Sequence, residues 1–111
     1  MALKQQIIEL VNLIPEGRVV YYGQLARLCG VNARVIGWTL SGMRESEWSS
    51  LPWWRVVAKT GYVASLKLGQ KGILQLDMLT REGVEIEAET VDMVKYLYDI
   101  EAGQTNFAGL L

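Results

Sequence analysis

The sequence contains no histidine and only one cysteine, Cys29. A zinc site of the usual nitrogen and sulfur type therefore cannot be built within one chain. Histidine is also the commonest general base, so Ser-His and Cys-His nucleophile pairs are excluded. A single cysteine excludes an internal disulfide and fits a reducing compartment. Chemistry by carboxylates or lysine remains open.

The chain also lacks an apolar run of about 18 residues, and its N-terminus has no charged-then-apolar signal pattern. We therefore expect a soluble, cytoplasmic protein without membrane contact. Half of the 111 residues are apolar, which is enough for one domain with its own core. We expect this domain to cover residues 1–100 and residues 101–111 to form a flexible tail.

The charges are unevenly distributed along the chain. Residues 1–80 carry nine basic and five acidic side chains, and residues 81–111 carry two and seven, so +4 and −5 sum to the net charge of −1. A net positive charge on residues 1–80, with the negative charge confined to residues 81–111, is compatible with a local phosphate-binding surface. Taken alone it is weak evidence, because most charges simply solvate a surface.

Apolar residues recur at helical spacing in five segments. These segments are residues 2–13, 23–28, 33–40, 70–81 and 90–98. We expect the fourth helix to be capped by Gly83. The residues of the fourth segment expected in the core are Ile73, Leu74, Leu76, Met78 and Leu79, and the apolar residues that indicate a helix in the fifth are Val91, Val94, Leu97 and Tyr98.

The second and third segments are short helices joined by a tight turn. Gly30 is free to adopt a left-handed conformation, and Asn32 is placed to cap the next helix. This pattern predicts a helix-turn-helix, although many αα-corners share it. Arg34 lies at the N-terminal end of the second helix, where such helices meet nucleic acid. Gly37 lies in mid-helix, where glycine lowers helix stability by about 1 kcal/mol relative to alanine. Its presence indicates that another part of the protein packs closely against the helix backbone there.

The remaining segments predict short strands and loops. Residues 18–21 are β-prone, and residues 41–50 are polar, as in a surface loop. Residues 56–58 and 62–64 predict a β-hairpin that turns at Thr60 and Gly61. A hairpin after a helix-turn-helix is the wing of a winged-helix domain. The expected fold is thus mainly α with a small β-hairpin, in a winged helix-turn-helix arrangement.

Two adjacent tryptophans, Trp53 and Trp54, follow Pro52. In a strand they would point to opposite faces, and in a loop at least one ring would stay partly exposed. An exposed ring beside Arg55 could stack on a flat ligand, because both side chains offer planar faces. A packed hairpin that carries two tryptophans is the alternative.

Three motifs together resemble a known family. Tyr-Tyr-Gly-Gln-Leu-Ala at residues 21–26, Arg-Val-Ile-Gly at 34–37 and Pro-Trp-Trp-Arg-Val-Val at 52–57 stand in the order found in the O6-alkylguanine-DNA alkyltransferases. The similarity is to their DNA-binding and active-site domain, and more specifically to the alkyltransferase-like proteins, their non-enzymatic relatives. It runs from about Lys4 to Glu85.

The third motif bears on catalysis. In the active family it is Pro-Cys-His-Arg-Val, whose cysteine thiolate takes the alkyl group from guanine. Here Trp53 stands at the cysteine position, and tryptophan has no nucleophilic atom. Trp54 stands at the histidine position, so the general base is also replaced. The resemblance therefore implies that the chain has no catalytic residue. Glu82 matches the family's glutamate, and with no histidine to orient it would have only a structural role, as a hydrogen-bonding or ion-pair partner.

The resemblance also implies which residues recognise DNA. Arg34 matches the arginine that fills the gap left by an extruded nucleotide, and Tyr22 the tyrosine that assists rotation and contacts the flipped base. Ala33 and Gly37 would allow close approach to a narrow minor groove. The pocket for the alkylguanine would be formed by Tyr22, Trp53, Arg55 and Val56, of which Arg55 is mostly structural in the family.

The implied function is recognition of O6-alkylguanine in double-stranded DNA by nucleotide flipping, followed by transfer to nucleotide excision repair proteins. No cofactor is implied, and we expect a monomer. Two alternatives remain: a winged-helix regulator that binds a defined sequence, and an active alkyltransferase with another acceptor. Two departures from the family concern the Met43-Arg44 position, where the family has Asn-Pro, and residues 65–67, which lack its tyrosine-serine-glycine run.

Overall fold

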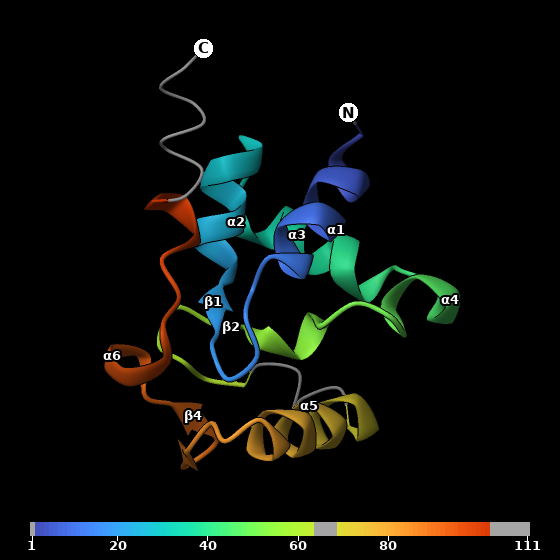
Figure 1. Cartoon of the computed structure of the whole chain (residues 1–111). Helices are drawn as coiled ribbons and strands as arrows, with labels where there is room; N and C mark the ends of the chain where they lie inside the picture. Colours follow the sequence, from blue (N-terminus) through green and yellow to red (C-terminus); the bar gives the residue numbers. More distant parts are fainter. Residues whose placement is uncertain (1, 64–68, 103–111) are drawn as a thin grey trace.

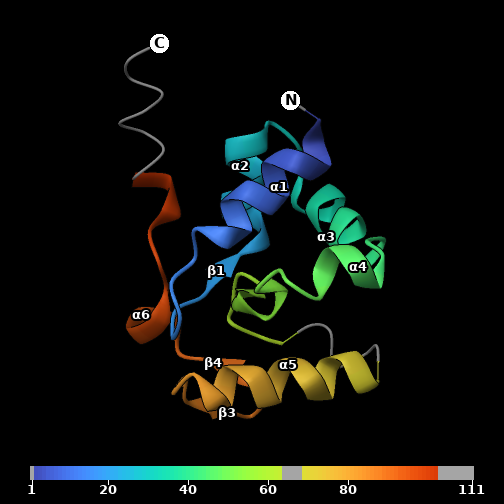
Figure 2. The same cartoon turned by 45° about the vertical axis from the view of Figure 1, so that its right-hand side comes forward.

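The computed structural model describes residues 2–63 and 69–102. The helices α1 (Leu3–Asn12), α2 (Tyr22–Cys29) and α3 (Ala33–Ser41) gather in one part of the molecule. Helix α5 (Gln70–Arg81) lies across the opposite end, and the strand β1 (Val20–Tyr21) lies between the two parts (Figures 1 and 2). The winged helix-turn-helix class predicted from the sequence is confirmed by a close structural match described below.

The first helix forms as its apolar spacing predicts. Ile7 and Val11, four residues apart, lie on one face and are fully buried, and Ile14 follows them into the core. The helix ends one residue before Leu13, close to Pro15, which cannot continue it.

The helix-turn-helix is also confirmed. Gly30 ends α2 in the left-handed conformation with a φ of 72°. The Oδ1 atom of Asn32 accepts a hydrogen bond from Val35 N at 3.1 Å, which caps α3. The packing predicted at Gly37 is wrong, because a Cβ atom added there would meet nothing within 4 Å.

The predicted hairpin between residues 56–58 and 62–64 does not form as such. The strand β2 (Val56–Val57) pairs in parallel with β1, with Val20 opposite Val56 and Tyr21 opposite Val57. Residues 58–62 make a tight turn closed by a bond from Ala58 N to Tyr62 O of 3.0 Å. Local turn signals could not reveal that β2 had a partner 36 residues earlier in the chain, since Val56 and Val20 meet only in the tertiary structure.

The small antiparallel hairpin lies further along the chain. It consists of β3 (Ile86–Glu87) and β4 (Thr90–Val91), and it turns at Ala88 and Glu89, whose φ angles are 51° and 60°. Tyr62 forms an antiparallel bridge to Thr90, which adds the segment after β2 to this hairpin. Gly61 is required there, because a Cβ atom would lie 2.1 Å from Val91 O.

Two short helices were not predicted. Helix α4 (Glu45–Trp48) lies within the segment expected to be an irregular loop, and Pro52 leads into a 3₁₀ helix, η1 (Trp53–Arg55). Only one turn of each forms, which is too short to give a clear apolar period in the sequence.

Helix α5 has the predicted bounds, but its buried face differs. Ile73 and Leu74 are 65% and 40% exposed, whereas Gln75 and Leu79 are buried. The Nε2 atom of Gln75 donates to Trp54 O at 3.1 Å and to Val56 O at 2.9 Å. A buried amide with these partners satisfies backbone carbonyls of η1 and β2, so the helix turns this polar residue inward.

The C-terminal segment differs from the single helix predicted over residues 90–98. After β4, Asp92 caps α6 (Met93–Tyr96) by accepting a hydrogen bond from Val94 N at 3.0 Å. Val94 is fully exposed and not in the core, whereas Ile100 is 2% exposed. Glu101 pairs with Arg27 at 2.6 Å, so the expected flexible tail does not begin at residue 101. Residues 103–111 lie outside the described part.

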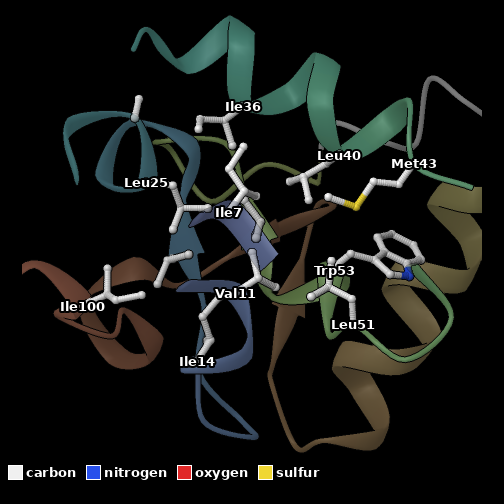
Figure 3. Close-up of a cluster of buried hydrophobic side chains, with 13 residues drawn as sticks. Ile7, Val11, Ile14, Leu25, Ile36, Leu40, Met43, Leu51, Trp53 and Ile100 are labelled. Atoms are coloured by element: carbon white, nitrogen blue, oxygen red, sulfur yellow. The ribbon is translucent and has the colours of Figure 1, made fainter. Parts of the chain in front are cut away.

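Two hydrophobic clusters hold these elements together. The first joins α1, α2, α3 and η1 (Figure 3). The second joins β2, the end of α5 and the hairpin. Trp54 packs against both clusters and so links them. Within residues 2–63 and 69–102, no helix is long and apolar enough to cross a membrane.

Candidate nucleic-acid interface

The outer surface of α3 carries three of the predicted DNA-binding residues. Ala33 and Arg34 are exposed, and the open space over Gly37 leaves the helix backbone accessible beside them. One turn after Arg34, Trp38 is 64% exposed, and the Cζ atom of Arg34 lies 5.9 Å from the centre of its ring. This surface therefore offers a guanidinium group, an aromatic face and approachable backbone together.

Trp38 was missed in the sequence. The available signal was its spacing, because residues four apart share one face of a helix. A cation over an exposed ring contributes about 0.5–1 kcal/mol, so Trp38 holds Arg34 only weakly and leaves it free to move toward a ligand.

Tyr22 begins α2 and packs partly against the first cluster. Burial raises the pKa of its phenol, and its hydroxyl group forms no hydrogen bond within the described residues. Its neighbour Tyr21 is engaged elsewhere, since its hydroxyl accepts from Arg27 Nη2 at 2.8 Å. Of the two tyrosines, Tyr22 is the one whose hydroxyl is available to a ligand.

Trp53 is largely buried, and the partly exposed ring expected of one of the two tryptophans is that of Trp54. Trp53 is 7% exposed and lies beside Met43 and Leu51 in the first cluster (Figure 3). Trp48 and Trp54 meet it edge-on, with ring centres 6.2 and 6.1 Å away. The three rings form a compact aromatic cluster around Trp53.

Trp54 points into the protein. Its Nε1 atom donates to Glu82 Oε2 at 2.9 Å, which fixes the ring between η1 and the end of α5. The structural role predicted for Glu82 is therefore seen: its carboxylate accepts a hydrogen bond from the indole of Trp54.

Arg55 completes this network. Its Nη2 atom lies 2.6 Å from Glu82 Oε2, and its Nη1 atom donates to Ile14 O at 2.7 Å. Gly17 N also donates to Glu82 Oε1, at 3.1 Å. Burial alone would raise the pKa of Glu82, but the hydrogen bonds from Arg55, Gly17 and Trp54 outweigh it and hold this pKa below 4.5.

These contacts bear on two of the predicted pocket residues. Each nitrogen of the Arg55 guanidinium donates to an acceptor within the protein, and Val56 is 1% exposed. Both side chains therefore make their contacts inside the protein. Val56 could contact a base only if the residues that cover it moved away. The predicted pocket roles of Tyr22 and Trp53 stay predictions.

Lys71 is a further residue that the sequence did not single out. It is the second residue of α5, and its Nζ atom lies 5.1 Å from the ring centre of Trp53 and 5.8 Å from that of Trp48. Partial burial lowers the pKa of Lys71 below 10.5. Only the folded chain brings this amine onto the two rings, so no local pattern could have indicated it.

Two observations bear on the chemistry that this part of the chain offers. Within the described residues, no three His, Cys, Asp or Glu side chains form a group that could hold a metal ion. Cys29, at the end of α2, is half-buried, and burial raises the pKa of its thiol. A raised pKa reduces the thiolate fraction, which is the nucleophilic form.

Residues 2–84 match the family described as 6-O-methylguanine DNA methyltransferase, DNA binding domain. A protein of Vibrio parahaemolyticus called DNA base-flipping protein is 36% identical over 94 residues, which cover 82% of this chain and 90% of that protein. Alkyltransferase-like protein 1 of Schizosaccharomyces pombe is 31% identical over 83 residues, which cover 73% of this chain and 75% of that protein. A crystal structure of S. pombe Atl1 with damaged DNA containing O6-carboxymethylguanine superposes with a TM-score of 0.78 at 26% identity, covering 87% of this chain and 94% of that one.

Replacing Glu82 with glutamine should destabilise the protein by about 3–5 kcal/mol near neutral pH, because Arg55 would keep its charge in a nearly dry site without a carboxylate. The folded pKa of Glu82 lies below its unfolded value, so its contribution is complete above the unfolded pKa and is lost as the pH falls through the folded one. Urea unfolding at a series of pH values should therefore show the gap between Glu82→Gln and the wild type closing toward acid.

The matched control is Asp77→Asn, which removes a carboxylate from the exposed Asp77–Arg81 pair of the same helix. It should cost about 1 kcal/mol or less. Equal losses in the two variants would contradict a dominant role for Glu82.

Proposed function

The chain belongs to the family of the 6-O-methylguanine DNA methyltransferase DNA-binding domain, in its alkyltransferase-like branch, and from this premise we propose that it recognises O6-alkylguanine in duplex DNA by flipping the damaged nucleotide without repairing it. The observation that carries the proposal is the outer surface of α3, where Arg34 is exposed beside open backbone at Gly37. The printed names of the relatives support it, since one is a DNA base-flipping protein and another was solved on damaged DNA.

Flipping a base costs a few kcal/mol of lost stacking and pairing, and less where an O6-alkyl group has already weakened the pair. Arg34 would enter the minor groove and replace the lost stacking, with Trp38 as a second planar surface one turn along the helix. Tyr22 would assist rotation and contact the flipped base with its hydroxyl, for which the described part of the chain offers no hydrogen bond. Ala33 and Gly37 would let the backbone of α3 approach the groove.

The absence of repair would follow from the substituted residues. Trp53 offers carbon at the position of the alkyl-accepting sulfur, and Trp54 donates its N–H to Glu82 instead of accepting a proton. Cys29 is no substitute, because it belongs to α2 and burial raises its pKa.

A protein that holds damage without removing it must transfer it. We propose that this monomeric protein acts in the cytoplasm, bound to the nucleoid when it holds DNA, and passes the lesion to nucleotide excision repair proteins. The support for this step is the resemblance alone.

One experiment tests the function against its alternatives. We expect tighter binding to a duplex containing O6-methylguanine than to the matched guanine duplex, and no transfer of radiolabelled methyl to the protein. Equal affinity for the two duplexes, with strong dependence on the surrounding sequence, would indicate a winged-helix regulator. Label on the protein would identify an active alkyltransferase.

Arg34→Ala should remove most of the preference for the damaged duplex, because nothing would fill the gap left by the extruded nucleotide. The measurement is the ratio of Kd values for guanine and O6-methylguanine duplexes. The control is Arg81→Ala, which removes an equally exposed positive charge from α5, away from α3 (Figure 1). A preference unchanged in Arg34→Ala would refute the insertion of Arg34.

Gly37→Ala should separate folding from binding. A Cβ atom meets nothing there, so alanine should stabilise α3 by about 1 kcal/mol through its helix propensity. If a groove approaches this backbone, the same methyl group should weaken binding to the damaged duplex. Thermal unfolding and Kd measurements on one sample give both effects, and a stabilised variant with unchanged affinity would show that DNA does not approach Gly37.

A further inference from the structure

Lys71 holds its amine on the aromatic cluster and has no acidic partner among the residues that the structure describes. None of the ion pairs formed within residues 2–63 and 69–102 involves it, although five other cations there do pair with carboxylates. Its Nζ atom lies instead over Trp53 and Trp48, at 5.1 and 5.8 Å from the ring centres. Aromatic faces stabilise a cation, but less than a hydrogen-bonded carboxylate does.

The amine also covers the position of the lost nucleophile. Leu40, Met43 and Leu51 pack with Trp53 in the first cluster, Trp48 and Trp54 make T-shaped contacts with its ring, and Lys71 lies over that ring. Only 7% of Trp53 is exposed, and the amine of Lys71 lies 5.1 Å from its ring centre, so a substituent that reaches this ring comes close to the amine.

This arrangement changes what the site should select. A bare apolar wall would accept alkyl groups of many sizes and reject few of them. A partly dehydrated ammonium group without a carboxylate partner instead favours a substituent that brings a negative charge, since a charge-assisted hydrogen bond would replace the water that the amine has lost.

We propose that Lys71 is a specificity residue that selects O6-guanine adducts carrying a carboxylate, of the carboxymethyl type, over neutral adducts of the same size. The inference rests on the proposed function, because it assumes that the O6 substituent of a flipped guanine reaches Trp53. The lowered pKa of Lys71 agrees with a partly dehydrated amine.

The test compares two adducts that differ in charge and hardly in shape. Duplexes of one sequence would carry O6-carboxymethylguanine, its neutral amide O6-carbamoylmethylguanine, or guanine. We expect the wild type to bind the carboxylate at least about tenfold more tightly than the amide, the value of one charge-assisted hydrogen bond.

Variants then assign the preference. Lys71→Met should bring the ratio between the two adducts close to one, and Lys71→Arg should retain a preference for the carboxylate. Lys59→Met is the matched control, because Lys59 is an exposed lysine in the turn after β2, and its loss should leave the ratio unchanged.

The outcomes are distinguishable. A wild type that binds the two adducts equally would overturn the role of Lys71 while leaving damage recognition intact, and so would a Lys71→Met variant that keeps the preference. Should neither adduct be preferred to guanine, the proposed function itself would fail. If Lys71→Met does not fold, equal binding of the two adducts by the wild type would still overturn the proposal, and Lys71→Arg tests whether a cation at this position carries the preference.

Discussion

The buried ion pair between Arg55 and Glu82 is the interaction on which the rest of the structure depends. Through it, four separate parts of the chain meet: the carbonyl of Ile14 after α1, the amide of Gly17 in the following turn, η1, and the end of α5. Desolvation opposes such a pair, and it is stable here because each charged group has further hydrogen-bonding partners. It fixes the orientation of η1, and therefore of the two tryptophans that precede Arg55.

The replaced residues fit this network without disturbing it. Trp54 gives Glu82 a hydrogen bond from its indole, so a side chain that cannot act as a base still supports the carboxylate. Trp53 fills space in the first cluster and is held by the rings of Trp48 and Trp54. Under the proposed function, this aromatic cluster would keep the architecture of the site without the chemistry of alkyl transfer.

The structure presents two surfaces that differ in size and in the groups that they expose. The outer face of α3 is open and carries Arg34 and Trp38, which suits contact with a regular duplex. The surface over Trp53 is small and carries the amine of Lys71, which suits one substituent of one base. The first surface would set the affinity for DNA, and the second would set which lesion is held.

The sequence by itself determined the elements whose signals are local: the apolar face of α1, the turn at Gly30, the cap at Asn32 and the bounds of α5. It also determined that residue 53 is a tryptophan, a side chain with no nucleophilic atom. Only the tertiary structure decided the parallel pairing of Val20 with Val56. It also decided that Gln75 is buried, whereas the helical period had predicted Ile73 and Leu74 on the buried face of α5. It alone decided that Trp54 meets Glu82 and that Lys71 lies on Trp53. The reason is that strand partners, buried faces and the neighbours of a ring are set by contacts between residues far apart in the chain, which local propensity does not encode.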